Sequence, residues 1–451
     1  MKTRKRDTNV LGTPIFHFSS RFFMVFGTAS IAIIAVYLTW TTNVVILLTM
    51  NIIVAIAAAM DYFLTPVPSM FGLNRPKPYP LAVDGPNDIF IDVVNRSGRW
   101  AQLLIQDDFP PTCLADNLPL MVGVGPGRSV RLSYRLVPQA RGDGEFGDID
   151  FWILGRLGLV WKHGRSEGRC AVKMYPGLSL IKRRKPGLWK PQARSAQRIH
   201  NRKGSGTEFE SLREYVAGDD SRLIHWSTTA RKGRLIVRQN REERGQTIYL
   251  ILDAGRMMTA RIDGKTKLDF AIEAALLLAY GALEMGDKVG VMVAAQDVLC
   301  HVAPSGGSGQ FGRILDATYS VQARFEEPRY YVSSAELSAK LRRRTLIVVF
   351  TDLIDERSSE GLIRYVLGLV PRHLPLVLAM SDTQTAAAAD AVPSTAQDLY
   401  RGGVASEILY RREKLMAKMI ARGAAVIDTP AAEISSAALD RYLEIKARGS
   451  L

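Results

Sequence analysis

Two long apolar segments near the start of the chain limit what it can fold into. They run from about Phe22 to Trp40 and from about Val44 to Leu64. Each approaches the roughly 20 residues that a helix needs to cross the hydrocarbon core of a bilayer. Only the short connection Thr41 to Asn43 separates them. We therefore expect a hairpin of two transmembrane helices that returns the chain to the side on which it began.

Basic residues flank this predicted hairpin on one side. Lys2, Arg4, Lys5, Arg6 and Arg21 precede or begin the first segment, and Arg75 and Lys77 follow the second. Positively charged flanks favour the cytoplasm. A cleaved signal peptide is the alternative for the first segment, but no small-residue cleavage site follows it. The sequence therefore predicts a multi-pass protein of the inner membrane, with its N-terminus and C-terminal domains in the cytoplasm.

The overall charge is compatible with several partners. The 451 residues carry a formal net charge of +15, which would suit nucleic acid, an anionic membrane surface or an acidic protein. Nine Lys or Arg residues and no acid lie between Lys182 and Lys203. This run predicts a solvated linker, either inert or lying against lipid head groups. No recognisable nucleic-acid-binding fold accompanies it, so we expect no specific nucleic acid. The three cysteines are scattered, which argues against a disulfide framework or zinc site.

Composition and periodicity divide the rest of the chain. Five prolines between Pro66 and Pro80 indicate an extended linker. Short alternating segments such as AQLLIQD and RSVRLSYRLV, separated by glycine-rich turns, then predict a small β-sandwich-like domain. The predicted divisions are a basic leader (1–20), two transmembrane helices (21–65), a Pro-rich linker (66–80), a β-rich domain (81–180), a basic linker (181–203), a charged segment (204–243) and an α/β domain (244–451).

The last division alternates apolar strands with amphipathic helices. TIYLILDAG, KVGVMVAA, TLIVVFTDL, PLVLAMSD and AAVIDT read as strands, and such alternation favours a mainly parallel sheet covered on both faces. DVLCHVAP is expected to pair antiparallel beside KVGVMVAA. We also expect a helix from Ser334 to Arg343 and a loop over the alanine-rich stretch Ala386 to Ala391.

The charged segment 204–243 contains acids, bases and aromatic residues in close succession. Gly218, Asp219 and Asp220 predict a turn and an N-cap for a short helix that carries Arg222, His225 and Trp226. One interpretation is a hydrolase-type enzyme that uses Asp219, Asp220 and His225 as an acid–base set. The other is a structural network of arginine–carboxylate bonds. No nucleophile or phosphate-binding loop accompanies the set, so we favour the second interpretation.

At this segment the sequence resembles the bacterial family called domain of unknown function 58. The likeness rests on Gly206, Glu208, Phe209, Arg213, Tyr215, Gly218, Asp219, Asp220, Arg222, Ile224, Trp226, Ala230 and Arg231. These positions, together with His225, are the predicted partner-binding or structural signature. The family layout also includes the double membrane span and a C-terminal α/β half. The resemblance implies an association with MoxR-type AAA+ ATPases.

The α/β domain resembles the von Willebrand factor A domain, whose metal site uses an Asp-x-Ser-x-Ser loop, a Thr and a later Asp. Here Asp253, Thr351 and Asp352 stand at predicted strand ends, but Gly255 and Met257 replace the two serines. Mg²⁺ needs several oxygen ligands, so we expect no bound metal and no other cofactor. The sequence thus predicts a membrane-anchored, non-enzymatic scaffold or adaptor whose degenerate domain binds protein partners in chaperone-like assembly or envelope maintenance.

Overall fold

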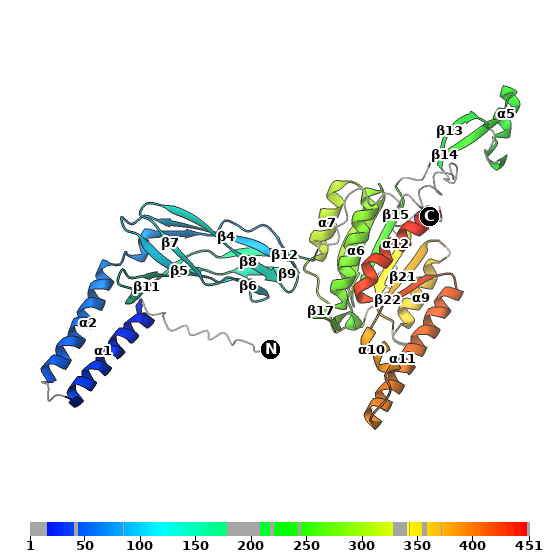
Figure 1. Cartoon of the computed structure of the whole chain (residues 1–451). Coiled ribbons are helices and arrows are strands. Elements are labelled where there is room, and N and C mark those ends of the chain that lie inside the picture. Colours follow the sequence, from blue (N-terminus) through cyan, green and yellow to red (C-terminus); the bar gives the residue numbers. More distant parts are fainter. Residues whose placement is uncertain are drawn as a thin grey trace. The chain divides into compact units, whose positions relative to one another are not determined.

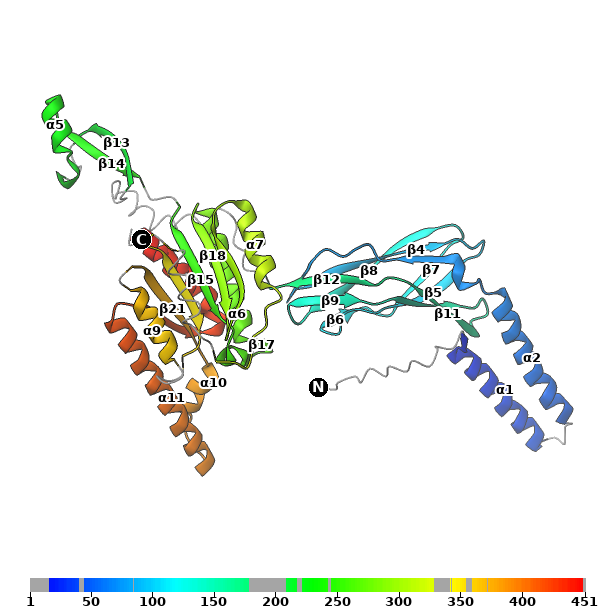
Figure 2. The ribbon, with the colours of Figure 1, turned by 180° about the vertical axis from the view of Figure 1, so that it is seen from behind.

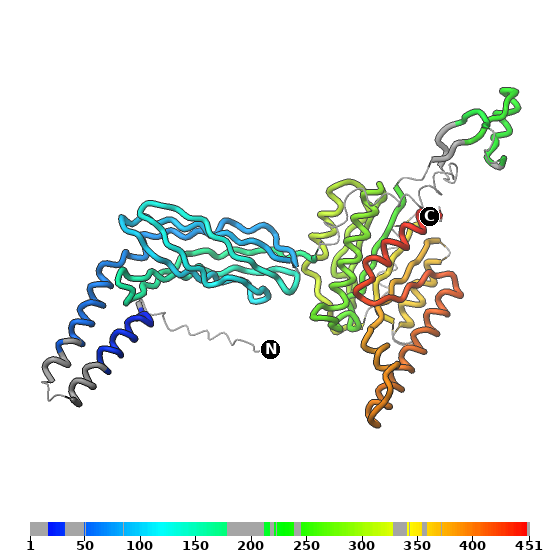
Figure 3. Tube along the Cα trace, viewed as in Figure 1, coloured from blue at the N-terminus to red at the C-terminus, as the bar shows by residue number. Residues whose placement is uncertain are grey.

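A computed structural model describes most of the chain in two compact units. The described residues are 16–39, 44–83, 85–177, 208–216, 221–241, 245–327, 341, 343–353, 359–370 and 372–448. The first unit is Met1–Tyr175 and the second is Pro176–Leu451. Figure 1 shows the elements, and Figure 3 follows the Cα trace through both units. The predicted basic linker 181–203 lies outside the described residues.

Two helices lie near the start of the described part of the first unit, where the sequence predicts a membrane hairpin. Only one of the two predicted membrane spans is supported by length and composition. Helix α1 spans Ser20–Thr39 and α2 spans Val44–Leu64. Among the described residues, one window, Asn51–Met70, is long and apolar enough to cross a membrane, with a mean hydropathy of 1.6. The predicted pair of spans is therefore supported, by length and composition, at the second segment only.

The β part of this unit contains three sheets. Its strands are β1 (Phe16–Phe18), β2 (Phe71–Asn74), β3 (Leu81–Ala82), β4 (Asn87–Asn95), β5 (Ala101–Asp107), β6 (Cys113–Asp116), β7 (Leu120–Val124), β8 (Ser129–Pro138), β9 (Gly142–Phe146), β10 (Ile149–Leu154), β11 (Val160–Ser166) and β12 (Cys170–Tyr175). The sheet orders are β1-β11-β10-β5-β7, β2-β4-β8-β6 and β3-β12-β9. Strands β1 and β2 come from outside the predicted range 81–180.

Alternation along the strands builds one core between the two larger sheets. Ile89, Ile91 and Val93 of β4 point to the same core as Leu103 and Ile105 of β5, because successive side chains of a strand face opposite sides. The predicted sandwich-like packing is present.

One residue that the sequence counted among the basic membrane flanks lies inside this β part. Arg75 is buried, donates to Asp107 and to the carbonyls of Gly147 and Gly168, and lies over the Phe146 ring. The guanidinium is held there through Nη1 and Nη2, which carry these hydrogen bonds. Arg75 is therefore a core ion-pair residue and gives no evidence for orientation in a membrane.

The second unit contains a small ribbon and an α/β domain. The ribbon consists of β13 (Glu208–Glu214), the short 3-10 helix Ser221–Leu223, α5 (Trp226–Lys232) and β14 (Ile236–Arg241). Strands β13 and β14 pair antiparallel, from Glu208 opposite Arg241 to Glu214 opposite Ile236.

The α/β domain follows a doubly wound order. Its elements are β15 (Thr247–Asp253), the 3-10 helix Arg256–Thr259, β16 (Arg261–Ile262), β17 (Lys265–Thr266), α6 (Lys267–Glu284), β18 (Lys288–Ala294), β19 (Val298–Ser305), α7 (Ser308–Thr318), β20 (Leu346–Thr351), α9 (Glu360–Leu369), β21 (Leu374–Ser381), α10 (Thr383–Asp390), α11 (Ala396–Ala421), β22 (Ala425–Pro430), the 3-10 helix Ala431–Glu433 and α12 (Ile434–Ala447). The sheet order is β19-β18-β15-β20-β21-β22. All neighbours are parallel except β18 and β19, which confirms the predicted α/β class and the antiparallel hairpin.

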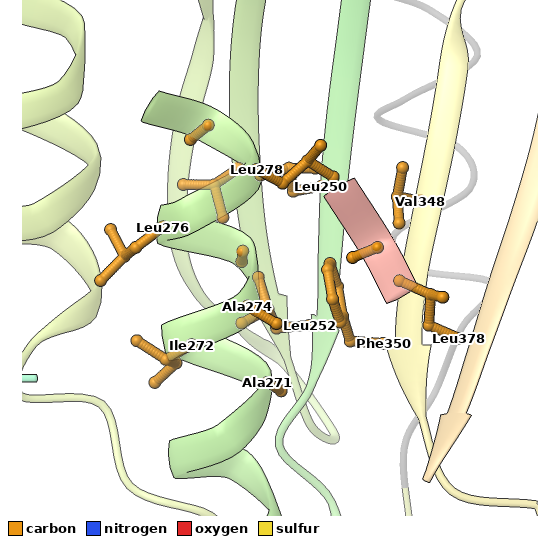
Figure 4. Close-up of a cluster of buried hydrophobic side chains, with 14 of the residues drawn as sticks. Leu250, Leu252, Ala271, Ile272, Ala274, Leu276, Leu278, Val348, Phe350 and Leu378 are labelled. Carbon is orange, nitrogen blue, oxygen red and sulfur yellow. The ribbon is translucent and has the colours of Figure 1, made fainter. Parts of the chain in front are cut away.

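Helices cover both faces of this sheet. Leu250 and Leu252 of β15 and Phe350 of β20 pack with α6 and α12 on one face, and Figure 4 shows the α6 side chains Ala271 and Ala274 directed towards those strands. Tyr249, Ile251 and Val349 face the other side, where they meet α9 and α11. Figure 2 shows the domain from this side. Strands buried on both faces explain the continuous apolar runs in the sequence.

One local prediction in this domain is wrong, and another falls almost entirely outside the described residues. The predicted Ala386–Ala391 loop is wrong, because Thr383–Asp390 forms α10 with Asp382 as its N-cap. Alanine has the highest helix propensity, and a capped alanine run forms a helix when it can pack on a neighbour, as α10 does on α11. Nearly all of the predicted helix Ser334 to Arg343 lies outside the described residues.

Candidate functional site

The carboxyl ends of β15 and β20 form the place where a doubly wound sheet binds ligands. The chain leaves β15 towards β18 on one side, whereas β20 continues the sheet on the other side. Such a switch point leaves a crevice beyond the strand ends. Asp253 ends β15, Thr351 ends β20 and Asp352 directly follows it, so the structure brings these three predicted residues together.

The oxygens of Asp253 are both occupied by groups of the same domain. Its Oδ1 accepts the Gly255 backbone N–H at 2.7 Å, and its Oδ2 accepts the Thr351 hydroxyl at 2.7 Å. The carboxylate is almost completely buried. Asp253 therefore closes the loop after β15 and ties it to β20.

Asp352 is neutralised by two cations that come from helices. Lys267 Nζ donates to Oδ2 at 2.6 Å, and Arg412 Nη1 donates to Oδ1 at 2.6 Å. All three side chains are at most 7% exposed. Arg412 also binds Asp428 through Nε at 3.0 Å and Nη2 at 2.7 Å and donates to the Leu353 carbonyl. Burial opposes the charge of Arg412, but its bonds to Asp428 and Asp352 raise the pKa of the guanidinium overall.

These contacts do not fit a divalent cation. The predicted positions Gly255 and Met257 bring no oxygen-bearing side chain to the loop, and a Lys ammonium and an Arg guanidinium already bind Asp352. Within the described part of the chain, no group of three or more His, Cys, Asp or Glu side chains has a metal-binding arrangement. Mg²⁺ would have to displace both cations to gain oxygen ligands. That no metal binds remains a prediction, now with a specific physical reason.

The sequence did not lead us to Lys267 and Arg412 as residues of this site, although the position of each in its helix is unusual. Lys267 is the first residue of α6, where a positive charge opposes the helix dipole; it is tolerated there because Asp352 faces it. Arg412 lies at helical spacing with the buried residues Leu415 and Met419 of α11. An arginine on the apolar face of a predicted helix indicates a buried acidic partner.

Helix α11 continues well beyond this edge of the sheet. Arg412 meets Asp352 at the strand ends, so residues 396–411 extend past them by about 24 Å at helical rise. Figures 1 and 2 show α10 packed along this overhanging part. Leu399 and Tyr400 are 65% and 73% exposed, and Val392 and Val404 are also exposed. We call α10 and residues 391–411 the overhang.

The signature ribbon is built differently from the prediction. Arg222 lies in a 3-10 helix, and Ile224 pairs with Val237, so the chain is extended before α5 begins at Trp226. The prediction of one short helix that carries Arg222, His225 and Trp226 is therefore wrong. The backbone N–H of His225 donates to the Ile236 carbonyl at 2.8 Å, which prevents helix formation at that residue.

His225 serves as the N-cap of α5. Its Nδ1 accepts the Thr228 backbone N–H at 3.4 Å and contacts the Thr228 hydroxyl at 2.9 Å. This nitrogen is thus used by the local fold. Gly218, Asp219 and Asp220 lie outside the described residues, so the proposed acid–base set is not assembled from described groups.

The remaining signature residues distribute over the ribbon. Glu208, Phe209 and Arg213 lie on β13, the backbone N–H of Tyr215 donates to the Leu235 carbonyl, and Arg231 is exposed on α5. Trp226 is 67% exposed. An exposed tryptophan on a helix that also carries the exposed Arg231 and Lys232 has the composition of a protein contact.

Three solved structures are among those similar to this chain. The VWA domain of SpRpn10 shares 14% identity, covering 42% of this chain and 92% of that one, with a TM-score of 0.26. Trypsin-activated alpha-2-macroglobulin from Escherichia coli shares 14% identity over 24% of this chain and 7% of its own length, with a TM-score of 0.19. The CARDB domain of a Pyrococcus furiosus protein shares 12% identity over 23% and 94%, with a TM-score of 0.15.

No curated protein matches the sequence. A family model does match: the one described as protein of unknown function DUF58 aligns with residues 211–388. This range runs from strand β13 of the ribbon through both strand ends of the carboxyl edge and into α10. The predicted resemblance is confirmed over residues 211–388, which match the DUF58 family of proteins of unknown function.

Proposed function

We propose that this protein is a membrane-anchored scaffold or adaptor whose von Willebrand factor A-like domain binds protein partners. One observation carries the proposal: the overhang presents Leu399, Tyr400 and Val404 to solvent beside a sheet edge at which Lys267 and Arg412 neutralise Asp352. Exposed apolar side chains grouped on one element mark interaction sites. A buried, fully bonded ion-pair network supports such a surface without offering a reactive group.

The signature ribbon is the second proposed contact. Trp226 supplies an exposed aromatic anchor, and Arg231 and Lys232 supply positive charge at the other end of the same short helix. Tryptophan and arginine are enriched where binding energy concentrates in interfaces. The ribbon and the overhang belong to the same unit, and we propose that both bind partners.

The proposed partner is a MoxR-type AAA+ ATPase, on the strength of the family resemblance. The proposed location is the inner membrane, with α1 and α2 as anchor and the remaining domains in the cytoplasm. The apolar window Asn51–Met70 supports the anchor. No specific nucleic acid and no cofactor are part of the proposal.

Co-purification from detergent-solubilised cells tests the proposal. The tagged full-length chain is expected to retain an AAA+ ATPase, and the pair Leu399→Ser and Tyr400→Ser to lose it. Phe325→Ser is the matched control, since Phe325 is 83% exposed in the same unit but outside the overhang. Absence of any AAA+ ATPase from the wild-type eluate argues against the partner. Equal recovery by the overhang variants argues against the surface.

The alternative function is a hydrolase that uses Asp219, Asp220 and His225. It predicts a different result for variants of these residues. Asp220→Ala with His225→Gln would abolish turnover of a hydrolysable substrate while leaving the partner bound. A scaffold shows no turnover to lose. Because His225 caps α5, its substitution also weakens the ribbon, so circular dichroism must accompany the assay.

A further inference from the structure

The first unit contains a junction at which loops of the β part hold the ends of both N-terminal helices. Asp61, near the end of α2, is completely buried. Its Oδ1 accepts the Leu157 N–H at 2.7 Å, and its Oδ2 accepts the N–H groups of Leu159 and Val160 at 2.9 and 3.3 Å. At the start of α1, the Ser19 N–H donates to the Leu159 carbonyl at 2.8 Å. The helix ends therefore lie at a fixed position on the loop 155–160.

Arginines surround this junction. Arg21 lies against the same loop, since a Cβ on Gly158 would be 3.1 Å from its Nη1. Arg99 donates to the Leu64 carbonyl at the end of α2, and Arg156 is exposed on the loop itself. In the contacting segments 19–21, 61–70, 97–100 and 155–160, the one acid is Asp61. Its charge is stabilised by three backbone N–H groups, so the exposed charge of these segments is positive.

The same segments also carry exposed apolar side chains, two of which directly follow an arginine in the chain. Phe63 of α2 is 80% exposed, and Trp100, beside Arg99, is 63% exposed. Leu157, beside Arg156, and Met70 are exposed as well. The Trp100 ring lies across Gly123, where a Cβ would be 2.7 Å from Cζ2, so its position is set by the sheet. We call segments 19–21, 61–70, 97–100 and 155–160 the collar.

Aromatic residues and arginines together are typical of the membrane–water interface, where the rings lie at head-group depth. The apolar window Asn51–Met70 ends within the collar, so the collar continues the surface that the proposed anchor gives to lipid. This continuity and the positive charge both favour an anionic lipid as the ligand of the collar. We propose that the collar binds the head groups of anionic phospholipids in the membrane that α2 enters, with Arg99 and Arg156 on phosphate and Trp100 at the interface.

This inference rests on the proposed membrane anchoring, and quenching by brominated lipids tests the two separately. The full-length chain is placed in nanodiscs whose phosphatidylcholine is brominated near the head group. We expect Trp100→Phe to remove a large share of the quenchable fluorescence. Trp226→Phe is the control, because Trp226 is comparably exposed in the other unit, and it should leave the quenched share unchanged. Equal quenching in wild type and Trp100→Phe overturns the collar. A chain that alkaline washing strips from bilayers refutes the anchoring itself.

Lipid selectivity is the second arm. Native mass spectrometry of the detergent-solubilised chain measures its preference for phosphatidylglycerol over phosphatidylcholine. Arg99→Gln with Arg156→Gln is expected to lower this preference about 30-fold, as two basic residues at a lipid surface contribute. Arg165→Gln with Arg169→Gln removes equal charge near the other end of β11 and should change it little. An unchanged preference in the first pair, or an equal loss in both pairs, contradicts the proposed site.

Discussion

Lys267 Nζ lies 2.6 Å from Asp352 Oδ2, and this contact joins the first turn of α6 to the end of β20. The ammonium occupies the carboxyl edge of the sheet, at the positions where the sequence suggested a degenerate metal site. It is covalently part of the chain, so its charge does not depend on cation concentration. Arg412 adds a second charge from α11, the helix that carries the overhang. Helix α11 therefore contributes both to the carboxyl edge of the sheet and to the proposed partner surface.

Lys267→Met should destabilise the second unit by about 3 kcal/mol, because it leaves a buried carboxylate with one cation instead of two. The thermal midpoint at 222 nm, followed on the solubilised full-length chain, measures the change. Lys265→Met is the control: its partly exposed pair with Glu273 should contribute less than about 1 kcal/mol. Equal midpoints for the two variants would show that the Lys267 pair contributes no more than a surface ion pair.

Arg412→Lys should be less harmful than Arg412→Met, yet clearly destabilising. A lysine keeps the charge but cannot bind Asp352, Asp428 and the Leu353 carbonyl together. We expect losses of about 1–2 and about 3–5 kcal/mol, respectively. The exposed neighbour Arg411, which pairs with Glu407, provides the control Arg411→Ala at under about 1 kcal/mol. Urea titration followed at 222 nm ranks the three, and any other order contradicts the assigned role.

Protonation of His373 should weaken the second unit in mild acid. Burial first, and then the neighbouring Arg372, lower the pKa of the imidazole below its usual value. The unfolded chain therefore binds more protons than the folded one just below the unfolded pKa of about 6.5. This contribution is complete above the unfolded pKa and is lost as the pH falls from that value through the lower folded pKa. His373→Gln should flatten the fall in thermal midpoint between pH 7.5 and pH 5, and a variant with the wild-type slope would exclude His373 as its source.

Asp61→Ala should loosen the junction between α2 and the β part. Removing the carboxylate leaves the N–H groups of Leu157, Leu159 and Val160 without their acceptor, which costs about 1–3 kcal/mol for each buried donor. Hydrogen exchange in a peptide covering 155–160 should accelerate about tenfold or more. Asp92→Ala, which removes an exposed ion pair on β4, should leave that peptide unchanged. Unaltered exchange in Asp61→Ala would mean that the loop does not depend on α2.

Much of the architecture could be predicted because it depends on local patterns. Apolar runs such as that of β15 are buried on both faces and have no polar alternation, which identifies a covered parallel sheet without any distant contact. The hairpin β18–β19 followed from its short turn. The alanine-rich α10 was misassigned because its helix is marginal alone and depends on packing against α11.

Local patterns of the sequence were enough to predict the family resemblance, the α/β class, and the carboxylates Asp253 and Asp352 at strand ends, because periodicity and motif order are local properties. The groups that those carboxylates bind depend on contacts between distant parts of the chain. Lys267 is 85 residues and Arg412 is 60 residues from Asp352 along the chain. A charge pair that forms through folding has no spacing rule, so the cations that occupy the edge, and the apolar overhang beside it, become visible only when the helices are placed on the sheet.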